Sequence, residues 1–125
     1  MKMNWIVVGS VSGFLAVALG AFGAHGLQAR LSPEGLDWWR TGVFYQLAHA
    51  PVLVLLGLLA LHARRVNAAG WALAVGSLVV SGTLYLMALG LPRGLGAVTP
   101  VGGLLLLAGW VLLALAAGRG RSGAK

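Results

Sequence analysis

Hydrophobic residues gather in four long runs along this chain, separated by short polar connections. The runs cover about residues 5–24, 43–61, 71–91 and 101–117, and none of them contains Asp, Glu, Lys or Arg. A helix needs about 20 apolar residues to cross the hydrocarbon layer of a membrane, within a range of about 17–25. The pattern therefore predicts an all-α integral membrane protein with four transmembrane helices.

The connections between the runs predict how the helices are arranged. Because these connections are short, neighbouring helices are expected to be antiparallel and to form one up-down-up-down bundle over residues 1–125. The connection "LSPEGLDWWR" (31–40) is the longest on its side. In it, Ser32 is expected to cap a short helix that starts at Pro33. Trp38 and Trp39 are then expected at the level of the lipid headgroups.

The first hydrophobic run carries a stripe of small residues. They recur at steps of three and four: Gly9, Gly13, Ala16, Gly20 and Gly23. Lys2 followed by an apolar run is also typical of a secretory signal peptide. A stripe of small residues, however, allows another helix to approach closely, and a signal peptide has no need of one. We therefore expect the first run to remain as a transmembrane helix.

Composition supports the membrane prediction and excludes several classes of protein. The chain is 59% hydrophobic and 9% charged, whereas about a quarter of the residues in a soluble domain are charged. The net charge of +7 is divided among short segments between the runs, so we expect no nucleic-acid partner. The absence of cysteine excludes disulfides, thiolate metal sites and thiol nucleophiles.

The distribution of basic residues predicts the orientation in the membrane. With four spans, both termini lie on the same side as the connection between the second and third spans. That side holds Lys2, Arg64, Arg65, Arg119, Arg121 and Lys125. The other side holds Arg30, Arg40 and Arg93, together with Glu34 and Asp37. Positive residues favour the cytoplasmic side, so the expected location is the cell (inner) membrane with both termini in the cytoplasm.

Polar side chains in the spans are concentrated in the predicted outer half of the bundle. Seven of them are candidates for a ligand-binding pocket: His25, Tyr45, Gln46, His49, Ser81, Tyr85 and Thr99. On the third span, Ser77, Ser81 and Tyr85 are four residues apart and share one helix face. Polar residues inside a membrane often mark a functional site. They also form hydrogen bonds between helices, worth about 0.6 kcal/mol each, so a purely structural role stays open.

Several functions are compatible with these residues. We expect a non-enzymatic membrane protein whose outer pocket binds a lipid, a quinone-like molecule or a partner helix. The partners would be membrane lipids, a second copy of the chain or another membrane protein. One alternative is an electron-transfer module that binds haem through His25 and His49. The sequence therefore does not specify whether a cofactor is bound. Another is an oligomeric transporter or channel in which histidine carries protons.

The sequence gives little support for catalysis or for a metal site. Glu34 and Asp37 lie on the predicted interfacial helix, where carboxylates are normally solvated, and the serine hydrolase, metalloprotease and P-loop motifs are absent. Two histidines within the spans lack a third convincing ligand for a metal ion. We therefore expect no catalytic residues and no bound metal.

Four segments resemble the YgdD-like family, which includes transmembrane protein 256. They are "GAFGAHGL" (20–27), "YQLAHA" (45–50), "SGTLY" (81–85) and "TPVGGLLLLAGW" (99–110), and they cover nearly the whole chain in the family's order. Proteins of this family often carry an aromatic residue and a second serine where this chain has Val80 and Thr83. The resemblance implies four spans, in bacteria an inner-membrane location, and a set of signature residues: His25, Gln46, His49, Tyr85, Thr99 and Pro100. It implies no activity, because the family is grouped under a domain of unknown function.

Overall fold

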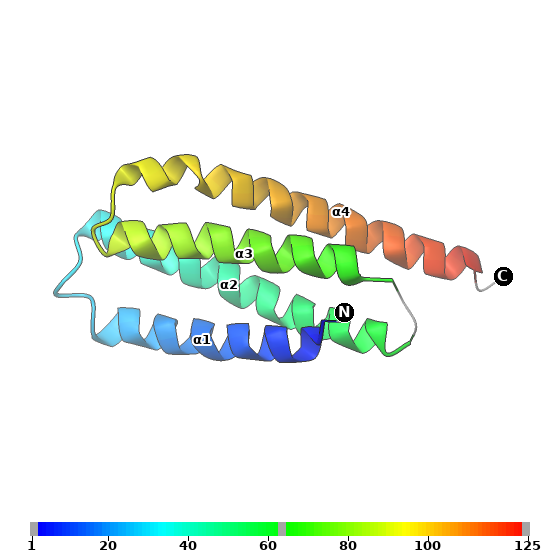
Figure 1. Cartoon of the computed structure of the whole chain (residues 1–125). Helices are drawn as coiled ribbons and strands as arrows, with labels where there is room; N and C mark the ends of the chain where they lie inside the picture. Colours follow the sequence, from blue (N-terminus) through cyan, green and yellow to red (C-terminus); the bar gives the residue numbers. More distant parts are fainter. Residues whose placement is uncertain (1–2, 63–64, 124–125) are drawn as a thin grey trace.

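Each of the four hydrophobic runs lies in one long helix of the computed structural model, which describes residues 3–62 and 65–123 (Figure 1). The helices are α1 (Trp5–His25), α2 (Pro33–Ala60), α3 (Asn67–Ala88) and α4 (Thr99–Gly123), and a short 3-10 helix, η1 (Arg93–Ala97), precedes α4. Helices of this length and hydropathy are sufficient to cross a membrane. They confirm the predicted all-α class with four transmembrane helices.

Successive helices are antiparallel, so the chain forms the expected up-down-up-down bundle (Figure 1). The extensive contacts are those between neighbours in the sequence: α1 with α2, α2 with α3, and α3 with α4. The start of α1 and the end of α4 lie at one end of the bundle, here called the terminal end. The connections 26–32 and 89–98 lie at the other end, here called the loop end.

The helix α2 differs from the prediction, because the connection 31–40 is largely part of it. The Ser32 hydroxyl accepts a hydrogen bond from the Gly35 amide at 3.0 Å, and Pro33 is the first helical residue, as expected for this cap. No break follows, so α2 continues for 28 residues. At 1.5 Å per residue it is about 42 Å long, which exceeds a hydrocarbon layer of about 30 Å. Trp39 is 4% exposed and belongs to the protein core.

The small residues of α1 form its contact surface with α2, as the stripe predicted. A methyl group at Gly9 would lie 2.7 Å from the Ala50 carbonyl oxygen. A methyl group at Gly23 would lie 2.4 Å from the indole nitrogen of Trp39. Two residues of the stripe between them face Ala50 and Val43. Because side chains here would collide with α2, the glycines allow the two backbones to approach closely.

Two buried tryptophans connect α1 to the rest of the bundle at its two ends. At the terminal end, the indole of Trp5 packs on Gly70 and donates a hydrogen bond to the Asn67 side chain at 3.2 Å. At the loop end, the indole of Trp39 donates to the Leu19 carbonyl at 2.8 Å, and its ring lies 4.7 Å from the Tyr85 ring. α1 is thus held close to its neighbours at both ends.

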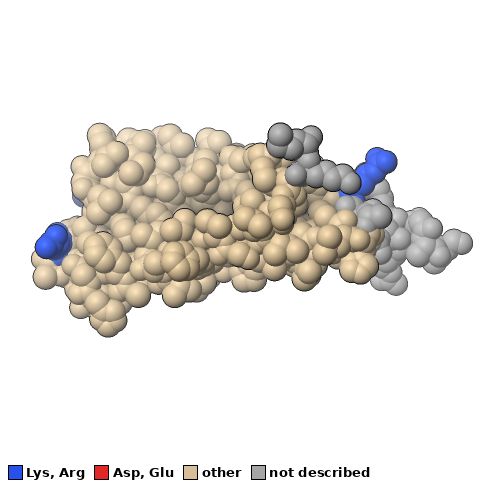
Figure 2. Space-filling view, turned by 60° about the horizontal axis from the view of Figure 1, so that its bottom comes forward, with Lys and Arg blue, Asp and Glu red and all other residues tan. Residues whose placement is uncertain are grey.

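Charged side chains of the described residues lie towards the ends of the bundle. On the face shown in Figure 2, blue side chains are confined to the two ends and the long middle is uncharged. At the loop end, the Arg93 guanidinium forms an ion pair with Glu34 at 2.6 Å and lies 5.5 Å from the Trp38 ring. Of the cations used to predict orientation, Lys2, Arg64 and Lys125 lie outside the described residues, and so do the side chains of Arg119 and Arg121.

Candidate functional site

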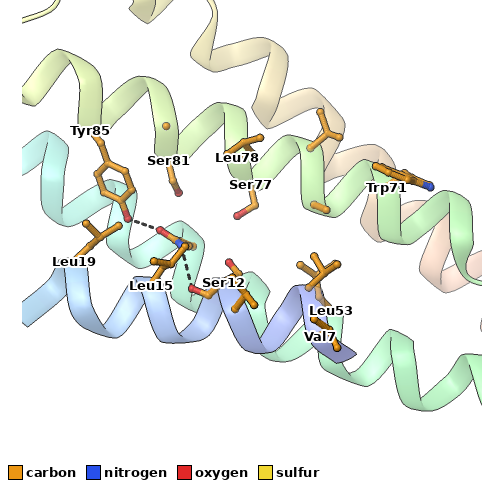
Figure 3. A pocket seen from close by; sticks show the side chains of 16 residues that line it. Val7, Ser12, Leu15, Leu19, Leu53, Trp71, Ser77, Leu78, Ser81 and Tyr85 are labelled. Carbon is orange, nitrogen blue, oxygen red and sulfur yellow. Dashed lines mark hydrogen bonds between the residues drawn. The ribbon is translucent and has the colours of Figure 1, made fainter. Parts of the chain in front are cut away.

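A groove runs between α1 and α3 and has α2 as its floor (Figure 3). Its volume is about 610 Å³. The walls are mainly aliphatic and include Val11 and Leu15 of α1 and Leu78 of α3, while Leu53 of α2 lies on the floor. In the described part of the chain, no Asp, Glu, Lys, Arg or His lines it. The groove therefore suits an uncharged molecule.

A side-chain amide on the floor of the groove joins three helices. The Tyr85 hydroxyl of α3 donates to Oε1 of Gln46 at 2.7 Å, and Nε2 of Gln46 donates to the Ser12 carbonyl of α1 at 3.0 Å (Figure 3). Within a bilayer these bonds satisfy polar groups that water cannot reach. The two contacts also fix which end of the amide is oxygen and which is nitrogen.

One turn before Tyr85, the hydroxyl of Ser81 makes a second bond between helices. It donates to the Gly42 carbonyl of α2 at 2.7 Å, and Ser81 is 3% exposed. A methyl group at Gly42 would lie 2.7 Å from the Tyr85 ring, so the glycine lets α3 approach α2 at this level. As the four-residue spacing predicted, Ser77, Ser81 and Tyr85 all line the groove from one face of α3.

The predicted pocket residue His49 lies outside the groove and contacts α4. Its Nε2 is 3.2 Å from the indole nitrogen of Trp110, and its Nδ1 is 2.8 Å from the Tyr45 carbonyl. An indole nitrogen only donates, so Nε2 accepts this bond. The proton of the neutral ring is therefore on Nδ1, which donates to Tyr45. The ring of Tyr45 stacks parallel to His49 and is 36% exposed.

The remaining two predicted residues, Thr99 and His25, also lie outside the groove. The hydroxyl of Thr99, at the start of α4, is 2.6 Å from the hydroxyl of Thr83 on α3. His25 is the exposed last residue of α1. Of the seven predicted residues, the structure thus brings Gln46, Ser81 and Tyr85 together in the groove. The other four are distributed over the α2–α4 contact, the α3–α4 contact and the end of α1.

The separation of these residues follows from helix geometry. Each residue of a helix turns about 100° from the one before, so neighbours such as Tyr45 and Gln46 face different partners. Depth in the membrane, on which the prediction of one pocket depended, does not specify that angle. The prediction omitted Trp39 and Gly42, which pack around the groove residues. Their spacing could have identified them, because residues 39, 42, 46 and 53 lie on one face of α2.

The structure also bears on metal and haem binding. Within residues 3–62 and 65–123, no group of three or more His, Cys, Asp or Glu side chains is placed to hold a metal ion. For the haem alternative, both ring nitrogens of His49 are already hydrogen-bonded inside the protein, and His25 lies at the end of another helix. Iron coordination by His49 would require the bond to Trp110 to break, so the pair does not fit a bis-histidine haem site.

The fold and the groove define a small four-helix integral membrane protein with an uncharged groove between its spans. The chain belongs to the family described as "Protein of unknown function (DUF423)", which matches it over residues 19–103. The YgdD-like proteins are part of this same family, so the resemblance seen in the sequence motifs is confirmed.

Similar proteins are known from several bacteria. UPF0382 membrane protein SH2409 of Staphylococcus haemolyticus is 43% identical over 114 residues, which cover 90% of this chain and 93% of that protein. UPF0382 membrane protein YwdK of Bacillus subtilis is 38% identical over 116 residues, covering 90% and 94%. No solved structure matches the chain. The names of these relatives confirm a membrane protein and specify no activity.

Proposed function

We propose that this protein is a non-enzymatic membrane protein that binds a neutral hydrophobic molecule, a lipid or a quinone-like compound, in the groove between α1 and α3. The observation that carries the proposal is the uncharged cavity of about 610 Å³ between two membrane spans. Binding sites for small molecules are typically about 300–1,000 Å³, mostly apolar, and contain a few polar groups. The groove has these properties, with its polar atoms on Gln46 and on one face of α3.

The size of the groove favours a chain-shaped molecule over a partner helix. A helix with its side chains is about 10–12 Å wide, so a 30 Å span occupies more than about 2,000 Å³. The groove offers about 610 Å³, so a single chain can enter it, whereas a helix would lie mostly outside it. A single acyl or prenyl chain fits such a space, and membrane lipids are therefore the proposed partners.

The acidic residues support a role other than catalysis. Glu34 is paired with Arg93 at the loop end, away from the groove. General acid–base catalysis needs a titratable pair within reach of the substrate, and the described lining of the groove supplies neither carboxylate nor imidazole. For location we propose the inner membrane with both termini in the cytoplasm, because six of the nine basic residues belong to that side.

A substitution that fills the groove tests the proposal. Gly82 lines the groove, and a methyl group added there meets no atom within 4 Å, so the Cβ of Gly82→Leu has room and the rest of the side chain is expected to occupy the groove. Gly103 of α4 also has open space around it and does not line the groove, which makes Gly103→Leu the matched control.

The measurement is native mass spectrometry of each protein released from a mild detergent. We expect the wild type and Gly103→Leu to retain a bound hydrophobic molecule that Gly82→Leu has lost. If all three proteins carry the same added mass, or if the wild type carries none, the groove is not a binding site and the proposal is wrong.

A further inference from the structure

The side chain of Ser77 is largely buried, and its hydroxyl group opens into the groove without a hydrogen-bond partner among the described residues. The side chain is on α3 and points towards α1 across the groove (Figure 3). Ser77 is 5% exposed, and within residues 3–62 and 65–123 its hydroxyl makes no hydrogen bond. Every enclosed side-chain polar atom in the described residues has a hydrogen-bond partner, so the Ser77 oxygen is accessible from the groove, where a bound group can pair with it.

The neighbouring hydroxyl groups of α3 show how unusual Ser77 is. Tyr85 and Ser81, on the same face, donate to the Gln46 side chain and the Gly42 carbonyl of α2. Thr83 donates within its own helix, to the Val79 carbonyl at 2.7 Å. Serine often makes this second kind of bond in helices, yet Ser77 makes neither kind in the described structure. Its oxygen faces the groove, so its rotatable O–H is available to a molecule bound there.

The groove contains a second unused donor. The side-chain amide of Gln46 carries two N–H bonds, and the Ser12 carbonyl accepts only one of them. Unpaired buried donors are rarer in proteins than acceptors with a spare lone pair. A bound group that only accepts hydrogen bonds would satisfy the Ser77 hydroxyl and the Gln46 amide. A carbonyl oxygen, with its two lone pairs, is such a group.

The depth of Ser77 restricts which carbonyl compounds reach it. Ser77 is the eleventh of the 22 residues of α3, so it lies about 15 Å from either end of the helix and near the middle of the hydrocarbon layer. The ester carbonyls of a phospholipid lie next to its headgroup, which a charged or zwitterionic lipid keeps at the membrane surface. A quinone ring is uncharged and carries its carbonyl groups directly on the hydrophobic part of the molecule.

From the free donors, the uncharged lining and the depth, we infer that the groove binds a neutral carbonyl compound of the quinone class. The Ser77 hydroxyl donates a hydrogen bond to a ring carbonyl, and the apolar tail lies along the walls formed by α1 and α3. This inference rests on the proposed function of the groove and adds the chemical class of the ligand and the residue that recognises it.

The test compares two probes that share a tail and differ in the ring. Decylbenzoquinone carries ring carbonyls, and decylbenzene does not. Binding of each probe to the full chain in detergent micelles is measured by titration calorimetry for the wild type, Ser77→Ala and Ser77→Thr. Ser10→Ala is the control, because Ser10 is an exposed serine of α1 that does not line the groove.

We expect Ser77→Ala to bind decylbenzoquinone about threefold to tenfold more weakly, as the loss of one hydrogen bond predicts. Ser77→Thr keeps the hydroxyl and should restore binding, and Ser10→Ala should bind like the wild type. Decylbenzene should bind the wild type more weakly than the quinone and respond little to Ser77→Ala. In the infrared spectrum, the carbonyl stretch of the bound quinone should lie lower in the wild type than in Ser77→Ala.

The failure of this inference is separable from that of the proposed function. If the wild type and Ser77→Ala bind decylbenzoquinone equally and Gly82→Leu does not bind it, the groove binds ligands but Ser77 does not recognise a carbonyl. If the wild type retains a phospholipid and binds no quinone, the ligand class is wrong and the groove is still a binding site. If Gly82→Leu binds the quinone as well as the wild type, both proposals are wrong.

Discussion

The Tyr85 hydroxyl donates a hydrogen bond of 2.7 Å to the side-chain oxygen of Gln46, although the two residues are 39 positions apart in the chain. Because the same amide donates to the Ser12 carbonyl, one glutamine connects α1, α2 and α3. Such a connection holds the two walls of the groove at a fixed distance from its floor. Its loss should therefore affect both stability and the shape of the groove.

Removing the Tyr85 hydroxyl tests the contribution of this bond to stability. Tyr85→Phe is expected to lower the free energy of unfolding by about 0.6 kcal/mol and by no more than about 1.7 kcal/mol, the range measured for hydrogen bonds between membrane helices. The measurement is unfolding in mixed micelles with increasing dodecyl sulfate. Tyr45→Phe is the matched control, because the Tyr45 hydroxyl makes no hydrogen bond among the described residues. Equal stability of the two variants would contradict the prediction.

The two groove serines should differ in their effect on the ligand-free protein. Ser81→Ala removes a bond to the Gly42 carbonyl and should lower the free energy of unfolding by about 0.6 kcal/mol. Ser77→Ala removes a hydroxyl that has no partner in the described structure, so it should leave stability unchanged or raise it slightly. The same unfolding assay, with protein freed of bound lipid, compares them. A larger loss for Ser77→Ala would mean that its hydroxyl has a partner within the protein.

Close packing of α1 on α2 predicts a strong effect at Gly9. A methyl group at Gly9 would lie 2.7 Å from the Ala50 carbonyl and from Val54, so Gly9→Ala should destabilise the fold by about 1–3 kcal/mol. Gly103→Ala meets open space and should instead stabilise α4 by up to about 1 kcal/mol. Unfolding of both variants measures the difference, and a Gly9→Ala protein as stable as Gly103→Ala would contradict the contact between the helices.

The tautomer of His49 is a prediction for nuclear magnetic resonance. With Nε2 accepting from Trp110, the ring should be neutral with its proton on Nδ1. Nitrogen spectra of histidine-labelled protein distinguish the two tautomers. Trp110→Phe removes the donor and should shift the Nε2 signal of His49. It should not shift that of His62, an exposed histidine with a similar Nδ1 contact to its own helix. A proton on Nε2 in the wild type would contradict this geometry.

The sequence predicts which residues form helices better than it predicts which side of each helix contacts its neighbours. Twenty-residue hydrophobic runs identify a membrane span without reference to any partner, and short connections make neighbours antiparallel. The glycine stripe of α1 also indicated the correct contact surface. At Gly9 and Gly23 a larger side chain would collide with α2, so these glycines mark where the neighbouring helix is close. These features depend on residues within one segment.

The candidate site depends on which residues from different helices face each other. Seven polar residues at similar depth suggested one pocket, but His49 faces α4 and Gln46 faces α1 and α3. The sequence also predicted a helix start at Pro33, but as a short separate helix, because the polar residues of its first turns resemble a connection and hide its continuity with the second span. The groove beside Ser77 could not be predicted from the sequence, because it is the space that the side chains of two separate helices leave unfilled.

The order in which the helices pack has a consequence for biogenesis. Among the described residues, all 16 that line the groove belong to α1, α2 and α3, and none belongs to α4. Each helix makes its extensive contacts with its neighbour in the sequence, so α1 and α2 can pair as a hairpin during membrane insertion, before the remainder of the chain is synthesised. The groove proposed to bind a ligand can therefore form once residue 88 has entered the bilayer, and α4 then packs against α3 without contributing to the described lining.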